Sequence, residues 1–302
     1  MKRIASATLA ICLMSLSLIP VAASQTNDLT PAQAAIVATE RAFAKLSVEQ
    51  GVRASFITYF AEDGIGFGPH PYKVKETLSK LPAPATRSTF VLNWTPIFGG
   101  VASSGDLGWN TGPTLREDRS PDKKPSQHGM FFSVWKKQSD GNWRVVLDLG
   151  ISTPSAVAPL DAPFQAARRT ITKPGAASSQ VDQHTASLLK AEQEFLSAAK
   201  SGSVQQAYST RLTDETRIHR SDSMPIVGES VIRKWLERQN VSLSGEPIKV
   251  ESASSGDLGY VYGSYEISGP KPENGYYARV WTRDAQNKWR IVIDVTTLIS
   301  EK

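Results

Sequence analysis

The spacing of apolar residues changes along the chain from a helical to a strand-like period, and it does so twice. Thr30 and Pro31 give a helix start ahead of apolar residues at three- and four-residue spacing up to Leu46. The same spacing returns from Leu188 to Ala199, before a glycine. Shorter helices are expected at 52–60, 74–81, 204–212 and 229–239, and strand-like runs end each half. This order predicts an α+β architecture with helices first and a curled antiparallel meander after them.

The sequence also repeats itself, which indicates two tandem copies of one module. The heptapeptide Ala-Ser-Ser-Gly-Asp-Leu-Gly stands at 102–108 and again at 253–259. Further equivalent positions are Glu40 and Glu192, Phe43 and Phe195, Phe56 and Tyr208, Gly129 and Gly275, Trp135 and Trp281, Trp143 and Trp289, and Asp148 and Asp294. The first copy has extra residues within 116–128, where a hairpin loop can lengthen at little cost.

The length of 302 residues allows two compact domains. The stretch before the second copy is rich in Pro, Ala, Ser and Thr, which is typical of a semi-extended linker. We predict a signal peptide at 1–23, a first domain at 25–155, a linker at 156–180 and a second domain at 181–302.

The first residues have the layout of a signal peptide. Lys2 and Arg3 precede an apolar run, and Pro20 and small residues follow it. We expect cleavage near Ala23 or Ser24, so that the protein is periplasmic or secreted; an uncleaved membrane anchor is the alternative.

Composition excludes several classes of site. The chain has one cysteine, Cys12, which would leave with the signal peptide, so the mature protein would have no disulfide and no thiolate metal site. The formal net charge of +5 includes Lys2 and Arg3, and the rest of the chain has no basic stripe. We therefore expect no nucleic-acid partner, because phosphate neutralisation requires clustered cations.

The last hairpin of each copy can be aligned from its turn. A two-residue turn at 140–141 pairs Trp135 with Val146 and Ser133 with Asp148. In the second copy an arginine stands at the position of Ser133, so the same spacing pairs an arginine with an aspartate. The predicted pairs of the second copy are Trp281 with Val292 and Arg279 with Asp294.

This register assigns each side chain of the second hairpin to one sheet face. We expect the apolar set to form the core face: Tyr276, Ala278, Val280, Trp289, Ile291 and Ile293. The aromatic and polar set suits a cavity floor or a packed interface: Tyr277, Arg279, Trp281, Arg290, Val292 and Asp294.

The motifs of both copies resemble the nuclear transport factor 2-like (SnoaL-like) superfamily, in particular an often exported branch. The likeness lies in Gly-Asp-Leu-Gly before Trp109 or Tyr260, a strand ending in Val-Trp, and the run Asp-Gly-Asn-Trp-Arg-Val-Val-Leu-Asp at 140–148. It implies a cone-shaped module in which a strongly bent antiparallel sheet wraps around an N-terminal helix pair and leaves a pocket. The superfamily includes ketosteroid isomerase, but no positions here match the catalytic tyrosine and two aspartates of that enzyme.

Glu192 and Glu40 each stand in the middle of an apolar helix face. Burial raises the pKa of a carboxyl, so either residue could be a general base or acid. Alternatively, both carboxylates accept hydrogen bonds that fasten the helix to the sheet, which the occurrence in both copies favours.

Other candidates belong to the second copy. Arg279 could hold a ligand carboxylate, with hydroxyls from Tyr262 and Tyr277, or it could form a structural salt bridge with Asp294. His219, where the first copy has Phe67, could shuttle protons beside Asp294 or could be a satisfied surface group.

Neither a metal nor a cofactor is expected. The four histidines lack metal-ligand spacing, and the sequence has no phosphate-binding loop and no nucleophile elbow.

The sequence favours two modules packed sheet to sheet as an intramolecular pseudo-dimer. The leading function is non-catalytic binding of a small, partly apolar molecule by the second module, with Tyr262, Tyr277, Arg279 and Trp281 as ligand-binding residues. A cofactor-free lyase or isomerase is the alternative, with Glu192, His219 and Asp294 as catalytic residues. A structural or assembly module is the second alternative.

Overall fold

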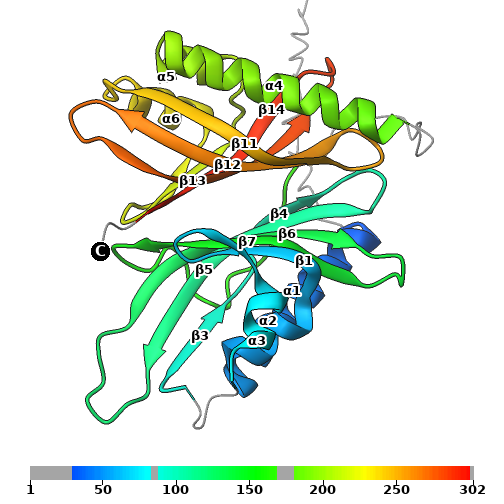
Figure 1. Ribbon diagram of the computed structural model, residues 1–302, viewed down its shortest axis with the longest axis vertical. Coiled ribbons are helices and arrows are strands. Elements are labelled where there is room, and N and C mark those ends of the chain that lie inside the picture. Colours follow the sequence, from blue (N-terminus) through cyan, green and yellow to red (C-terminus); the bar gives the residue numbers. More distant parts are fainter. Residues whose placement is uncertain (1–28, 83–87, 169–179, 300–302) are drawn as a thin grey trace, which may run out of the picture.

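The computed structural model describes residues 29–82, 88–168 and 180–299. Two bent sheets lie face to face in the centre of the molecule, and helices cover the outer face of each sheet (Figure 1). The predicted signal peptide at 1–23 and most of the linker beyond residue 168 lie outside the described residues.

The first module contains eight strands in the order β2-β1-β7-β6-β5-β4-β8, with β3 paired to β5. Its elements are α1 (Pro31–Gln50), α2 (Val52–Tyr59), β1 (Phe60–Phe67), β2 (Pro71–Lys73), α3 (Val74–Lys80), β3 (Phe90–Trp94), β4 (Phe98–Val101), β5 (Leu107–Asp118), β6 (Gln127–Lys137), β7 (Trp143–Thr153) and β8 (Gln165–Ala166). β1 lies parallel to β7, and β8, from the predicted linker, lies parallel to β4.

The second module repeats this order in six strands, β10-β9-β14-β13-β12-β11. Its elements are α4 (Val181–Ser201), α5 (Val204–Ser209), β9 (Arg217–Arg220), β10 (Ile226–Val227), α6 (Glu229–Leu236), β11 (Ser242–Ser252), β12 (Leu258–Ser268), β13 (Glu273–Arg283) and β14 (Trp289–Leu298). The long β11 corresponds to β3 and β4 together, because all three strands pair with the same following strand of their module. The predicted α+β class with two bent sheets is confirmed.

The predicted helix ends are also found. The Thr30 hydroxyl accepts a hydrogen bond from the Gln33 backbone N–H at 3.2 Å, which caps α1. Gly202 ends α4. The extra residues of the first copy lie in the loop between β5 and β6.

Equivalent glycines allow each sheet to bend sharply. A Cβ atom on Gly112 would lie 1.9 Å from the Thr95 carbonyl oxygen, and one on Gly263 would lie 2.1 Å from the Glu246 carbonyl oxygen. Only glycine permits this close approach of neighbouring backbones. The missing side chain on Gly263 also leaves room for the ring of Tyr277.

The hairpin register is partly as predicted. Ser133 pairs with Asp148 and Arg279 pairs with Asp294. Trp135, however, pairs with Val145, one residue away from the predicted partner. The hairpin loop is longer than two residues, and a β-bulge beside Trp135 restores the predicted register beyond it.

The same bulge places Trp281 opposite Ile291, so the predicted pair with Val292 is wrong. The predicted core face of this hairpin is wrong in part, because Ala278 packs between the two sheets whereas Trp289 and Ile291 belong to the cluster under α4. Arg279 and Trp281 lie toward α4, whereas Val280 packs against the other module. Both sheet faces are therefore buried, one under the module's own helices and the other under the second sheet, and periodicity does not distinguish two buried faces.

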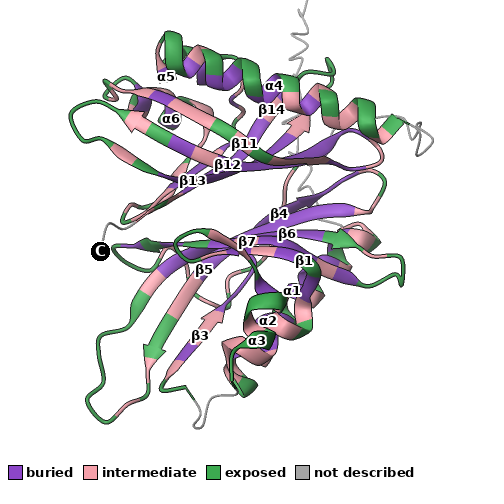
Figure 2. Ribbon diagram, in the orientation of Figure 1, coloured by how far each residue is buried: buried purple, intermediate pink, exposed green. Residues whose placement is uncertain are grey.

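Three apolar clusters hold the fold together. One lies inside each module, around Phe43 in the first and Phe195 in the second. A third lies between the sheets and joins Trp109 and Phe132 to Tyr260 and Val280. Figure 2 shows that the facing strands of both sheets are largely buried, while the outer helices have exposed faces.

The repeated heptapeptide makes a reciprocal contact between the modules. The Ser103 N–H donates to the Asp257 carboxylate at 3.0 Å, and the Ser254 N–H donates to Asp106 at 3.1 Å. The hydroxyls of Ser104 and Ser255 lie 2.9 Å apart between these bonds. These bonds are reciprocal, as in a two-fold symmetric interface, and Asp257 additionally accepts the Ser103 hydroxyl. We call these two loops, 103–106 and 254–257, the serine clasp.

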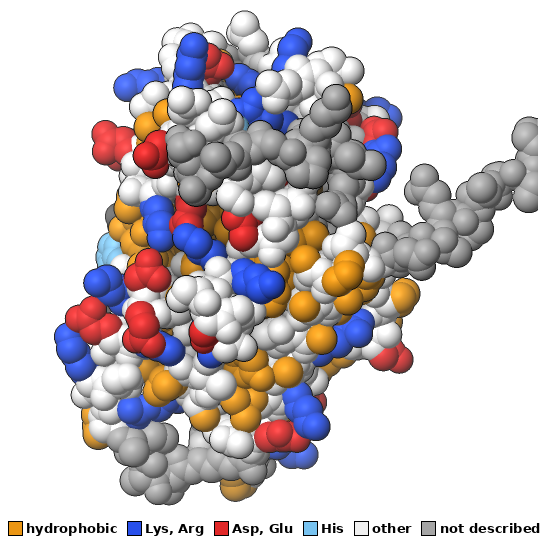
Figure 3. Space-filling model, turned by 90° about the vertical axis from the view of Figure 1, so that its right-hand side faces the viewer, with side chains coloured by type: hydrophobic (Ala, Val, Ile, Leu, Met, Phe, Trp, Pro, Cys, Tyr) orange, Lys and Arg blue, Asp and Glu red, His pale blue; other side chains and the backbone are white. Residues whose placement is uncertain are grey.

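Charged side chains of both signs are interspersed on the face drawn in Figure 3, where no extended basic patch forms. No helix in the described ranges is long and apolar enough to span a membrane.

Candidate functional site

A cavity of about 490 Å³ opens into the second module. Helices α5 and α6 and strands β9, β11, β12, β13 and β14 contribute residues to it. Its apolar wall consists of Val204, Trp235, Leu236, Val241, Leu243 and Ile267. Tyr208, Arg279 and Thr296 are buried and form the inner wall, whereas Arg238 and Lys271 are exposed and form the rim.

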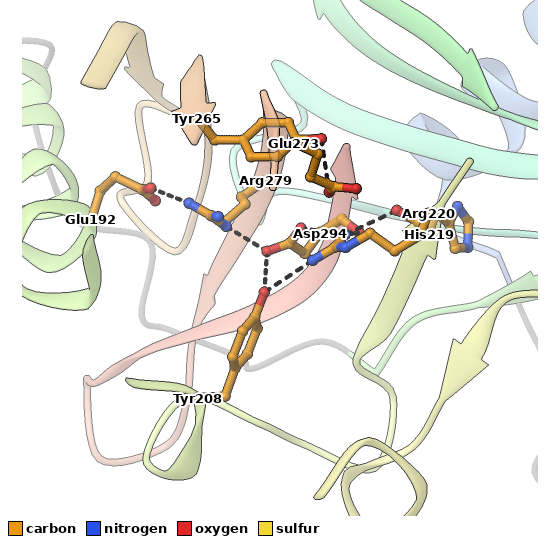
Figure 4. A network of polar contacts seen from close by, with 8 residues as sticks. All are labelled: Glu192, Tyr208, His219, Arg220, Tyr265, Glu273, Arg279 and Asp294. Atoms are coloured by element: carbon orange, nitrogen blue, oxygen red, sulfur yellow. Dashed lines mark hydrogen bonds and ion pairs between the residues drawn. The ribbon is translucent and has the colours of Figure 1, made fainter. Parts of the chain in front are cut away.

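Arg279 of β13 is one of the residues of the inner wall and is fully buried. Its Nε donates to Asp294 at 2.5 Å, and its Nη1 donates to Glu192 of α4 (Figure 4). The guanidinium stacks between the rings of Phe195 and Tyr277, at 4.5 and 4.1 Å from their centroids. Its Nη2 has no hydrogen-bond partner among the described residues.

Asp294 of β14 accepts from three side chains. Tyr208 donates its hydroxyl at 2.6 Å and Arg220 donates its Nη1 at 2.8 Å, in addition to Arg279. Burial acts to raise the pKa of this carboxyl, but the charges of Arg220 and Arg279 outweigh it and hold the pKa well below its ordinary value. An ionised carboxylate with two cationic partners is a weak proton acceptor.

Glu192 fastens α4 to the sheet. Besides its ion pair with Arg279, it accepts a hydrogen bond from the indole N–H of Trp281 at 2.9 Å. The first module repeats this bond, since the indole of Trp135 donates to Glu40 at 2.7 Å. In both modules a glutamate therefore bonds the long helix to the sheet, which is the structural role that the sequence favoured.

His219 and Tyr262 lie on the opposite sheet face, toward the first module. The ring of Tyr262 packs edge-on against Phe67 of the first module, 5.8 Å between centroids. His219 is buried and points away from Asp294 (Figure 4), so the expected proton shuttle between these two side chains is not assembled. Burial and the charges of Arg217 and Arg220 lower the pKa of His219 to about 3. The alternative of a surface histidine is also wrong.

Tyr208 and Arg220 were not among the site residues predicted from the sequence. Tyr208 stands where the first copy has Phe56, and Arg220 directly follows His219. A position-by-position comparison for polar side chains that only one copy carries would have indicated Tyr208. Arg220 lies on a strand paired with β14, which the spacing alone did not indicate.

The first module has a different interior. Ser133 replaces Arg279, and Glu40 accepts from uncharged donors: Trp94 at 2.8 Å, Trp135 at 2.7 Å and Ser133 at 2.5 Å. Phe56 replaces Tyr208, and its ring packs 5.2 Å from that of Phe43. No arginine in the described residues pairs with Glu40 or Asp148, the counterparts of the two ion-paired carboxylates.

The pKa directions reflect this difference. Burial raises the pKa of Glu40, and burial together with the charge of Glu40 raises the pKa of Asp148 well above its ordinary value. Carboxyl groups with raised pKa values contribute stability below the pKa of the unfolded chain, and that contribution is lost as the pH rises through the folded-state pKa.

We therefore expect Asp148→Asn to stabilise the protein relative to wild type, and the gain to grow between pH 4 and pH 8. The amide removes a carboxyl that is costly to ionise in the fold. Urea unfolding at both pH values measures the difference. The matched control is Asp294→Asn, which breaks ion pairs and should destabilise by several kcal/mol at pH 8, about 3–5 by analogy with other buried pairs. A gain from Asp148→Asn that is equal at the two pH values would contradict the assignment.

Within the described ranges, no three His, Cys, Asp or Glu side chains lie close enough together to hold a metal ion.

Comparison with known proteins finds neither a matching family model nor a matching curated protein. Solved structures do match. A ketosteroid isomerase-like protein from Erwinia carotovora atroseptica is 17% identical, over 40% of this chain and 99% of that chain, with a TM-score of 0.34. A nuclear transport factor 2-like superfamily protein from Salmonella enterica is 12% identical over 40% of this chain and 94% of that chain, also with a TM-score of 0.34.

A cystatin-like fold protein from Burkholderia xenovorans is 22% identical over 41% of this chain and 97% of that chain, with a TM-score of 0.33. The Salmonella protein has the name of the superfamily that the sequence motifs resemble, and each match spans about two fifths of the chain. At such identities the likeness concerns the fold alone, and the function has to be argued from the site.

Proposed function

We propose that the chain is a non-catalytic binding protein for a small, partly apolar molecule, which the cavity of the second module holds. The observation that carries this proposal is the cavity itself, about 490 Å³, with an apolar wall and a buried polar inner wall. Cavities of roughly 300–1,000 Å³ that combine apolar surface with a few oriented polar groups are typical of small-molecule sites.

The state of the acidic groups favours binding over catalysis. A general base needs a free lone pair within reach of the substrate. Asp294 and Glu192 are both engaged by Arg279, and His219 lies on the other sheet face. The lyase or isomerase that the sequence left open would have to break these ion pairs before it could remove a proton.

The first module acts, in this proposal, as the other half of an internal pseudo-dimer. Its interior is packed with aromatic rings: the ring centroids of Phe56, Tyr59 and Trp94 lie 4.7 to 5.2 Å from that of Phe43. Its sheet covers the face of the second sheet that the helices leave open. Its role is to support the binding module rather than to bind a ligand.

We also propose that the protein works after export, to the periplasm or the outside of the cell. The support is the basic, apolar and small-residue order of the first 23 residues. Expression of the full chain followed by N-terminal sequencing tests this: a product that begins near Ser24 in the periplasm or medium supports export, and an intact chain in the cytoplasm contradicts it.

The binding proposal is tested by incubating the purified full chain with a metabolite extract and measuring retained molecules by native mass spectrometry. Val241→Trp places a large ring at the cavity wall and serves as the blocked variant. We expect one molecule per wild-type chain and none on the variant. Retention of the same molecule by both proteins, or of nothing by either, would overturn the proposal.

A further inference from the structure

We infer that the ligand is an apolar molecule with a single negative charge, most simply a carboxylate, whose charged group binds Arg279. This inference rests on the proposed function and adds the chemical class of the ligand. It stands on an unpaired buried donor, on the charges around the cavity and on the nature of its walls.

The first observation is the free donor. Nη2 of Arg279 is buried without a partner, while the other polar atoms of the guanidinium bind Asp294 and Glu192. Leaving a charged donor unsatisfied costs more than about 1–3 kcal/mol, so an acceptor from a ligand has a strong advantage there. The residue lines the cavity, where such an acceptor would arrive.

The second observation is the charge balance. Four cationic side chains line the cavity, namely Arg220, Arg238, Lys271 and Arg279, against one acidic residue, Glu273. Behind the inner wall, Glu192 and Asp294 offset two of these charges. One positive charge remains in excess.

Two of the four cations lie at the rim. Arg238 and Lys271 are exposed and form no ion pair with any described residue. A ligand with one negative charge would balance the site, and a dianion would carry one charge too many. Together, the inner arginine and the two rim cations favour a charged acid over its neutral amide.

The third observation is the wall between the inner arginine and the rim. Trp235, Leu236, Leu243 and Ile267 give it an apolar surface. Desolvating a ring or short chain against this surface stabilises binding by about 25 cal/mol per Å² of buried apolar area. The body of the ligand is therefore apolar, and only its end is charged.

Isothermal titration of the full chain at pH 8 with three probes of one shape tests the inference: 2-naphthoate, neutral 2-naphthamide and 2-naphthyl phosphate, which has nearly two charges at this pH. We expect naphthoate to bind at least about tenfold more tightly than naphthamide, since a hydrogen bond to a charged group is lost in the amide. The phosphate should bind no more tightly than naphthoate.

Two charge-neutralising variants locate the effect without disturbing the buried ion pairs. Lys271→Gln should weaken naphthoate about two- to fivefold, as expected for an exposed charge, and leave naphthamide unchanged. Lys200→Gln makes the same change on α4 outside this cavity and should alter neither affinity. Val241→Trp should abolish naphthoate binding.

Equal binding of naphthoate and naphthamide would overturn the inference and leave the proposed function standing. So would a neutral ligand retained from the metabolite extract. Tightest binding by the phosphate would show that the site takes dianions and would also overturn it. If no probe binds and no extract molecule is retained, both proposals fail.

Discussion

Arg279→Met is expected to lower the free energy of unfolding by about 3–5 kcal/mol, because it leaves two buried carboxylates without their shared cation. Glu192 would keep only the indole of Trp281, and Asp294 would keep Arg220 and Tyr208. Urea unfolding at pH 7, followed by far-UV circular dichroism, measures the change.

The counterpart substitution in the first module is the control. Ser133→Ala removes one neutral donor from Glu40 and should cost about 1 kcal/mol. A triple variant, Arg279→Met with Glu192→Gln and Asp294→Asn, removes the carboxylates as well and should recover much of the loss. Equal costs for Arg279→Met and Ser133→Ala would contradict the importance of the ion pairs.

The pH dependence gives a second readout for the same site. The folded-state pKa of Asp294 is lowered, so its contribution to stability is present above its unfolded pKa, roughly pH 4, and is lost as the pH falls through the folded-state pKa. In Arg279→Met the shift is smaller, and the acid-induced loss of stability below pH 4 should shrink.

The second large effect is expected in the serine clasp. Asp257 is only 5% exposed and accepts from the Ser103 N–H, the Ser103 hydroxyl and the Ser255 hydroxyl. Asp257→Ala removes this charged acceptor and should cost about 2–3 kcal/mol, as for hydrogen bonds to a charged group. The midpoint of urea unfolding would fall accordingly.

Asp106→Ala is the symmetry-matched control for the clasp. Asp106 is more exposed and receives one N–H from the other loop, that of Ser254, so its loss should cost about 1 kcal/mol. The two loops contact each other, and the double variant should therefore deviate from the sum of the single variants by more than about 0.5 kcal/mol. Strict additivity would mean that the clasp does not act as a unit.

Local chemistry made much of this fold predictable. Thr30 and Gly202 mark helix ends through capping, a rule that acts within a few residues. The order of helices and strands could be predicted in both modules because the two copies have the same pattern, so each supports the elements predicted in the other. The Arg279–Asp294 pair followed from the turn spacing and was confirmed.

The remaining features depend on the packing of distant segments. Trp135 is out of the predicted register because the hairpin loop is longer than two residues, and the bulge restores the register only beyond it. Neither feature has a sequence signature as clear as a glycine turn. The sequence did not show which face of β9 meets the other module, so His219 was expected beside Asp294. Arg220 reaches Asp294 across a parallel strand pair that joins segments 74 residues apart.

The difference between the two interiors has a consequence for how the protein would respond to its ligand. A symmetric homodimer presents every substitution twice and so carries its sites in pairs. Here the arginine-lined inner wall occurs in one half, while Phe56 and Ser133 occupy the corresponding places in the other. If the proposed ligand binds there, saturation should follow a simple hyperbola with a Hill coefficient of one, because the described residues form this arginine-lined wall in one module alone.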